Sequence, residues 1–90
     1  MLVRRVVGDS MLPTLRSNQL VMAFSRVKPS LGNLVIVKYD GKEIIKRLTK
    51  IEPGKLYITG DNPNSSSDSR HFGWVSQSDL IATVIWPRKK

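Results

Sequence analysis

Short apolar runs recur along the chain, and turn-forming residues separate them. Several runs are rich in β-branched or aromatic side chains, which favour strands. No stretch repeats its apolar residues every 3.6 positions, so we expect little helix. The runs that predict strands cover residues 20–24, 34–39, 43–51, 55–59 and 80–86.

Two turn signals join these runs into hairpins. Asp40-Gly41 is a strong two-residue hairpin signal, and Pro53-Gly54 is a further turn pair. Only residues 11–16 suggest a helical turn, with Ser10 as its N-cap. The pattern predicts a mostly β fold, a small antiparallel coiled sheet or barrel, in a single domain over residues 1–90.

Composition excludes several kinds of site. The 90 residues include no cysteine and a single histidine, His71. Disulfides, thiolate metal sites and a cysteine nucleophile are therefore excluded, and one histidine cannot form a histidine cage. We expect no metal and no organic cofactor.

Charge and hydropathy bear on partners and location. Lysine and arginine number 15 against 7 acidic residues, a net charge of +8. This balance suggests an acidic partner, although charge spread over solvated faces also serves solubility. No apolar run approaches the roughly 20 residues needed to cross a bilayer, and the first residues lack a signal peptide's long apolar region. These features predict a cytoplasmic protein, while removal of a membrane anchor would leave the same sequence.

The segment GDSMLPTL, residues 8–15, is the first candidate for chemistry. A serine hydroxyl acts as a nucleophile only beside a base and in a sharply held position. Gly8 permits a tight turn, and Pro13 stiffens the backbone that follows. Ser10 is therefore either a nucleophile with N–H groups arranged as an oxyanion hole or simply a helix N-cap.

A lysine in the run 43–51 is the second candidate. Alternate side chains of a strand share a face, so Lys46 lies with Ile44 and Leu48, while Arg47 lies on the opposite face. A lysine between apolar neighbours is desolvated, which lowers its pKa and suits a general base. The alternative is a snorkelling lysine at a strand edge.

Residues 60–75 form a polar segment rich in Asn and Ser. The simplest interpretation is an exposed flexible loop. Asp68 and Arg70 could pair and order it, although an exposed pair is worth only about 0–1 kcal/mol. His71 lies three positions after Asp68, which suggests a rival Ser–His arrangement with Ser10.

Together the three segments resemble the conserved boxes of the type I signal peptidases. GDSMLPTL is similar to their serine box, IIKRLTKIEPG (44–54) to their lysine box, and GDNPNSSSDSRHFGWV (60–75) to their last box, in the same order. LGNLVIVKY (31–39) resembles the strand between the first two boxes. The resemblance implies a serine endopeptidase with a Ser–Lys dyad on a mostly antiparallel β catalytic core.

The resemblance also implies roles for individual residues. Ser10 would be the nucleophile and Lys46 the general base. Ser66 would match the loop serine that orients the lysine amine. Asp68 and Arg70 would match the pair that fixes this loop against the site.

Other positions match the family less closely. Met11 and Pro13 would shape the substrate cleft. Many family members carry a hydroxyl where Gly8 stands, so the oxyanion hole would rest on the nucleophile's own N–H and ordered water. The family usually has Asp where Asn33 stands and Arg where Pro63 stands, and we expect local consequences from both changes.

Size and the opening RRVVGDSMLPTL (4–15) resemble the small soluble members that mature nickel-type superoxide dismutase. That resemblance implies a polypeptide precursor as partner, whose N-terminal leader is removed. Nucleic acid is not expected as a partner, and the basic surface suits at most weak contact with an anionic membrane.

Three alternatives remain at this stage. One is a membrane-associated signal peptidase core that cleaves secretory signal peptides. Another is a self-cleaving domain of the LexA type, although the chain has no Ala-Gly pair of the kind such domains cut. The third is a basic, non-enzymatic β module that binds nucleic acid through its large aromatic residues, which are Tyr39, Tyr57, Trp74 and Trp86.

Overall fold

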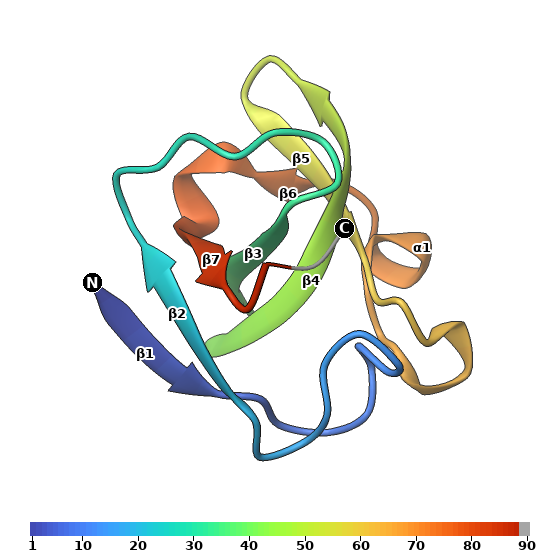
Figure 1. The fold of residues 1–90 in the computed structure, drawn as a ribbon. Helices are drawn as coiled ribbons and strands as arrows, with labels where there is room; N and C mark the ends of the chain where they lie inside the picture. The colour runs from blue at the N-terminus through green and yellow to red at the C-terminus, as the bar shows by residue number, and fades with distance from the viewer. Residues whose placement is uncertain (89–90) are drawn as a thin grey trace.

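One antiparallel sheet of seven strands organises the computed structural model, which describes residues 1–88 (Figure 1). The order across the sheet is β1-β2-β7-β3-β4-β5-β6. The mostly β prediction is therefore confirmed. The strands are β1 (Leu2–Arg5), β2 (Leu20–Phe24), β3 (Leu34–Tyr39), β4 (Lys42–Glu52), β5 (Lys55–Thr59), β6 (Val75–Ser76) and β7 (Leu80–Trp86).

Five of these strands coincide with the predicted runs. β2, β3, β5 and β7 have the predicted bounds, and β4 is one residue longer at each end. β1 and β6 were not predicted. Each is short, and β1 carries two arginines, so neither shows a distinct apolar run. Both lie at the ends of the strand order, where a strand pairs on one side alone.

The β3–β4 hairpin forms at the predicted turn. Asp40 and Gly41 both have positive φ, 51° and 75°, as a two-residue type I′ turn requires. This turn brings Tyr39 opposite Lys42 and fixes the register along the hairpin, in which Val35 faces Lys46. The register sets the face on which each β4 side chain lies.

The curled sheet separates two apolar clusters. The first includes Val6, Met11 and Ile36 with Ile45 packed against it, and the second includes Leu48. Residues of β4 therefore alternate between the clusters. Lys46 shares the face of Leu48, as predicted, and so points away from the first cluster.

Helix is scarce, as predicted. The described residues contain one short helix, α1 (Ser69–Phe72), and 3₁₀ turns at Pro63–Ser65 and Gln77–Asp79. The expectation of a helical turn capped by Ser10 was wrong. Residues 11–16 form successive turns with one helix-like hydrogen bond, from Leu15 N–H to the Met11 carbonyl at 2.9 Å. One such bond is too little to establish a helix.

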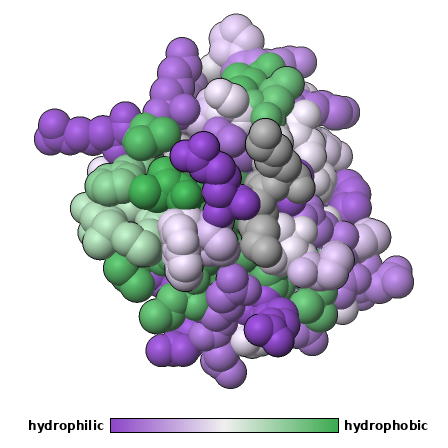
Figure 2. Space-filling view, in the orientation of Figure 1, coloured by the Kyte–Doolittle hydropathy of each residue, from purple (hydrophilic) through white to green (hydrophobic). Residues whose placement is uncertain are grey.

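The outer surface of the β1–β2 edge exposes apolar side chains. Val3 lies opposite Met22, and Met22 lies opposite Trp86. Val3, Trp86 and the flanking Leu20 and Phe24 are exposed. Figure 2 shows apolar residues gathered on the side of the molecule where β1 and β2 lie. A contiguous exposed patch of this kind is typical of a contact surface.

No helix within residues 1–88 has the length and apolar character needed to cross a membrane.

Candidate active site

The loop after β5 packs directly on the segment that contains Ser10. The Asn62 backbone N–H donates to the Ser10 carbonyl at 2.8 Å, and the Asn62 side chain donates to the Asp9 carbonyl at 3.1 Å. The Thr14 hydroxyl donates to Asp61 in the same loop. Segments about fifty positions apart in sequence are therefore held together by polar contacts at several points.

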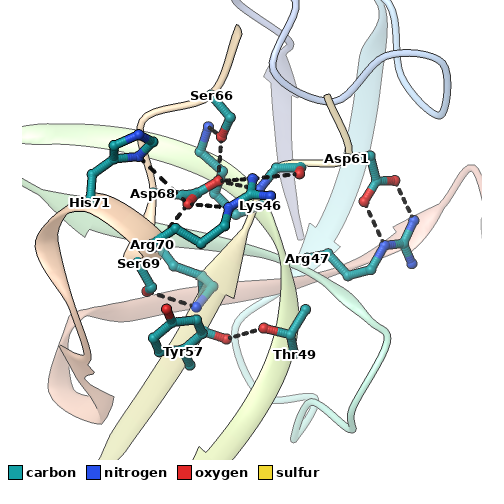
Figure 3. Close-up of polar contacts among 12 residues, drawn as sticks. Lys46, Arg47, Thr49, Tyr57, Asp61, Ser66, Asp68, Ser69, Arg70 and His71 are labelled. Atoms are coloured by element: carbon teal, nitrogen blue, oxygen red, sulfur yellow. Dashed lines mark hydrogen bonds and ion pairs between the residues drawn. The ribbon is translucent and has the colours of Figure 1, made fainter. Parts of the chain in front are cut away.

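Lys46 is almost completely buried, with 4% of its surface exposed. Its amine donates a hydrogen bond to the Ser66 hydroxyl at 3.1 Å (Figure 3). Burial lowers the pKa of Lys46, because a charged amine loses water that the protein does not replace. The negative charge of Asp68 opposes this shift, and the positive charge of Arg70 adds to it.

Asp68 is the centre of the network behind the lysine. Its side chain is fully buried and accepts from the Ser66 hydroxyl at 2.5 Å, the Gly60 N–H at 2.7 Å and the Arg70 guanidinium at 2.6 Å. Burial alone would raise the pKa of Asp68, but these hydrogen bonds, led by Arg70, hold it well below its usual range. The pairing with Arg70 was predicted, but the expectation of an exposed pair was wrong for Asp68.

The network fixes the direction of the Ser66 hydroxyl. Its single proton goes to Asp68, so its oxygen is left as the acceptor for Lys46. A neutral amine has two protons and one lone pair. When one proton is directed at Ser66, the orientation of the lone pair is restricted. The arrangement suits a lysine that accepts a proton from a neighbouring group.

Ser10 and Lys46 line the same pocket, which has a volume of about 230 Å³. Met11, predicted to shape a substrate cleft, also lines this pocket, whereas Pro13 is exposed and is not part of its wall. A larger pocket of about 520 Å³ lies beside the residues that precede β3 and the end of β7. It contains neither Ser10 nor Lys46, so the smaller pocket is the candidate site.

An ion pair beside the site was not anticipated. Arg47 donates to both carboxylate oxygens of Asp61, at 2.8 and 2.7 Å, and to the Gly32 carbonyl at 2.6 Å. Since Asp61 also binds Thr14, this pair links β4 with the Ser10 segment. The sequence analysis placed Arg47 on the face opposite Lys46 but gave no sign of its partner, which follows β5.

The departures from the signal peptidase boxes have local structural roles. Gly8 has a φ of +80°, a conformation that suits glycine in a tight turn. Asn33 accepts a hydrogen bond from the Ser30 N–H at 2.7 Å, and Pro63 begins a 3₁₀ turn.

His71 does not share the Ser10 pocket. It lies on α1 with 61% of its side chain exposed, and its Nδ1 is 4.0 Å from Asp68. The Asp68 carboxylate is directed mainly at Ser66 and Arg70. This geometry gives His71 no close partner at Ser10.

Comparison with known proteins identifies the family. The family described as Peptidase S24-like matches residues 1–84. The chain belongs to the peptidase S24-like family. This S24-like chain is also similar to the signal peptidase I of Bacillus caldolyticus, with 42% identity over 62 residues. The match covers 66% of this chain and 31% of the relative, so the S24-like chain matches about a third of that protein's length.

Gly60 is the first target for a test of the S24-like site. A Cβ at this position would lie 2.7 Å from the Ser10 carbonyl and would also clash with the Ser66 side chain. We expect Gly60→Ala to lower the free energy of unfolding by about 1–3 kcal/mol, measured by urea denaturation. Ser67→Ala, at an exposed neighbouring position, should change it by less than about 0.5 kcal/mol. Equal stability of the two variants would contradict the close packing described.

Lys46→Met tests the burial of the amine. Because the pKa of Lys46 is lowered from 10.5 in the folded state, the unfolded chain binds more protons between the lowered pKa and 10.5. Folding stability should therefore rise with pH across that window. Lys46→Met should remove this rise and be at least as stable as the parent at pH 7, measured by denaturation at several pH values. Lys50→Met, at an exposed position of the same strand, should keep the rise of stability with pH. If the rise is lost in Lys50→Met or persists in Lys46→Met, the buried Lys46 amine is not its source.

Proposed function

We propose that this chain is a serine endopeptidase with Ser10 as nucleophile and Lys46 as general base. The observation that carries the proposal is the buried Lys46 amine, held by Ser66, in the wall of a pocket that Ser10 also lines. Family membership and the similarity to a signal peptidase I support a serine peptidase. A cofactor has no part in the proposed chemistry.

The proposed reaction proceeds through an acyl-enzyme. Neutral Lys46 accepts the Ser10 hydroxyl proton as the oxygen attacks the scissile carbonyl. The lysinium then protonates the leaving amine as the peptide bond breaks. A water molecule gives its proton to the neutral Lys46, attacks the ester and releases the new carboxyl end with Ser10 restored.

The backbone at Ser10 supports an oxyanion site. The Ser10 carbonyl is held by Asn62, and no hydrogen bond found within residues 1–88 uses the Ser10 N–H. This free N–H is a donor for the negative oxygen of the tetrahedral intermediate. One such donor is worth about 3 kcal/mol in serine proteases that have been tested by mutation.

Two unpaired strand edges border the pocket and suit an extended peptide. Within residues 1–88, β1 pairs with β2 alone, and residues 42–46 of β4 pair with β3 on one side only. Residues from both edges line the pocket that contains Ser10. A substrate strand that enters between them would bind through its backbone, a common mode of peptide recognition.

For the substrate, we propose the N-terminal leader of a precursor protein, of the kind carried by nickel-type superoxide dismutase. The resemblance of the opening segment to the small maturation proteases supports this choice. A second candidate is a secretory signal peptide, cleaved at a membrane surface. The exposed apolar residues of the β1–β2 edge, including Val3 and Trp86, support that alternative.

Peptide cleavage tests the proposal. The purified chain is offered a superoxide dismutase leader peptide and a secretory signal peptide, and products are identified by mass spectrometry. We expect the parent to cut the leader, and Ser10→Ala and Lys46→Ala to lose at least about a hundredfold in kcat/KM while remaining folded. His71→Ala is the matched control and should retain most of the activity.

The outcomes separate the alternatives. Cleavage of the secretory peptide alone keeps the dyad and favours the membrane-associated function. Loss of activity in His71→Ala as severe as in Lys46→Ala would contradict the lysine assignment. Absence of cleavage of either peptide by the parent, together with salt-dependent binding of single-stranded nucleic acid, would favour the binding module.

A further inference from the structure

An ion pair bridges the two strand edges that border the pocket. Arg4, on β1, donates from Nε to one carboxylate oxygen of Glu43 at 2.6 Å and from a terminal nitrogen to the other at 3.4 Å. Glu43 lies near the start of β4. The strands β1 and β4 share no backbone pairing within residues 1–88, so this side-chain contact spans the gap between them.

The ion pair has a defined place along the pocket. Arg4 lies between Leu2 and Val6 in every-second-residue spacing, so the three side chains share a face. Glu43 shares a face of β4 with Ile45 in the same way. Leu2, Val6 and Ile45 belong to or pack on the first apolar cluster. Val6 and Ile45 thus share a face with Arg4 and Glu43 and lie nearer along the chain to Ser10 and Lys46, although the Lys46 side chain points to the opposite face of β4. Arg4, Val6, Glu43 and Ile45 all line the pocket. Side chains two residues apart on a strand point to the same face.

An extended peptide in this gap would contact first the apolar pair Val6 and Ile45 and then the charged pair Arg4 and Glu43. The side chain beside Ser10 would face Val6 and Ile45, which are apolar. The side chain two residues along the peptide would face Arg4 and Glu43, since strands advance by the same distance per residue. The pocket therefore presents an apolar position followed by a charged one.

The charges around the pair are unequal. Lys38 lies directly opposite Glu43 on β3. The Arg4 hydrogen bonds and, to a lesser extent, the positive charge of Lys38 hold the pKa of Glu43 below its ordinary value. Lys38 is thus a second cation near Glu43. Arg4 has no carboxylate other than Glu43 within ion-pair distance among residues 1–88.

We propose that the Arg4–Glu43 pair selects substrates with an acidic side chain at the peptide position two residues from the one beside Ser10. This inference rests on the proposed peptidase function. A substrate carboxylate replaces Glu43 on Arg4, and Glu43 remains near Lys38. A basic substrate side chain cannot exchange partners in this way. It would pair with Glu43 and leave Arg4 without a carboxylate.

Peptide binding and cleavage test the proposal separately. Three otherwise identical peptides carry Glu, Gln or Lys as the third residue before the scissile bond, two positions from the residue beside Ser10. A second set carries them as the third residue after the bond. Binding to Ser10→Ala is measured by NMR titration, and kcat/KM is measured with the parent. In one set we expect the Glu peptide to bind roughly threefold to fivefold more tightly than the Gln peptide, the range of an exposed ion pair, and the Lys peptide to bind most weakly.

Variants assign the effect to the pair. Arg4→Gln in the Ser10→Ala background should remove the preference for Glu, and Glu43→Gln should keep or increase it. The double exchange Arg4→Glu with Glu43→Arg places the acidic residue on β1 and the basic residue on β4. It should retain an ion pair but weaken the preference for the Glu peptide. Arg16→Gln, at an exposed arginine outside the pocket, controls for net charge and should leave the preference unchanged.

The result that overturns the proposal is equal binding of the Glu, Gln and Lys peptides in both sets, binding of none of them, or a preference that survives Arg4→Gln. Failure of the parent to cut any peptide would contradict the proposed peptidase function instead. The binding preference of Ser10→Ala does not depend on cleavage, so the two failures are distinguishable.

Discussion

The buried hydrogen bond between the Lys46 amine and the Ser66 hydroxyl is the interaction on which the site depends. A lysine inside a protein disfavours folding while it is charged, and it favours the neutral form that a general base requires. The surrounding structure must therefore hold the amine in place without restoring its proton. A hydroxyl achieves this, because it accepts a hydrogen bond from the amine and carries no charge of its own.

The position of that hydroxyl depends on contacts from several parts of the chain. Asp68 accepts the Ser66 proton and is held by the Gly60 N–H and by Arg70. Gly60 in turn lies so close to the Ser10 carbonyl that a side chain would not fit. The loop that orients the lysine is thus the loop that packs against the segment containing Ser10, and a displacement of one moves the other. Arg47 and Asp61 reinforce this link from the neighbouring position of β4.

Local patterns were sufficient for much of the fold. The β-branched run 34–39 and the Asp40-Gly41 turn specify a hairpin through nearest neighbours, and the hairpin register decides the face of Lys46. Contacts between residues far apart in the sequence could not be predicted from local patterns. The full burial of Asp68 arises from packing around Gly60, and a polar segment gives no sign of it. The turn around Ser10 was misjudged because Ser and Pro near an apolar run resemble a helix start. Here the segment is closed at its base by the hydrogen bonds of Val6 with Asn18 and Gln19, and it is held by Asn62 from a distant loop.

The short strand β1 shows the same limit. Its sequence, LVRR, lacks a distinct apolar run, and its place in the sheet depends on pairing with β2. Once placed, it supplies one border of the pocket and the Arg4 that bridges to Glu43. Residues that appear to be only a basic terminus in the sequence thus become part of the wall of the pocket that Ser10 lines.

The central claim is that burial keeps the Lys46 amine ready to accept a proton. An NMR titration of the lysine side-chain ε-methylene groups measures this directly, with the Lys46 signal assigned by its absence in Lys46→Arg. The account predicts that Lys46 titrates clearly below the ordinary value of 10.5. Titration of Lys46 at or above 10.5 would contradict it, since the amine would then be an ordinary charged lysine and no base for Ser10.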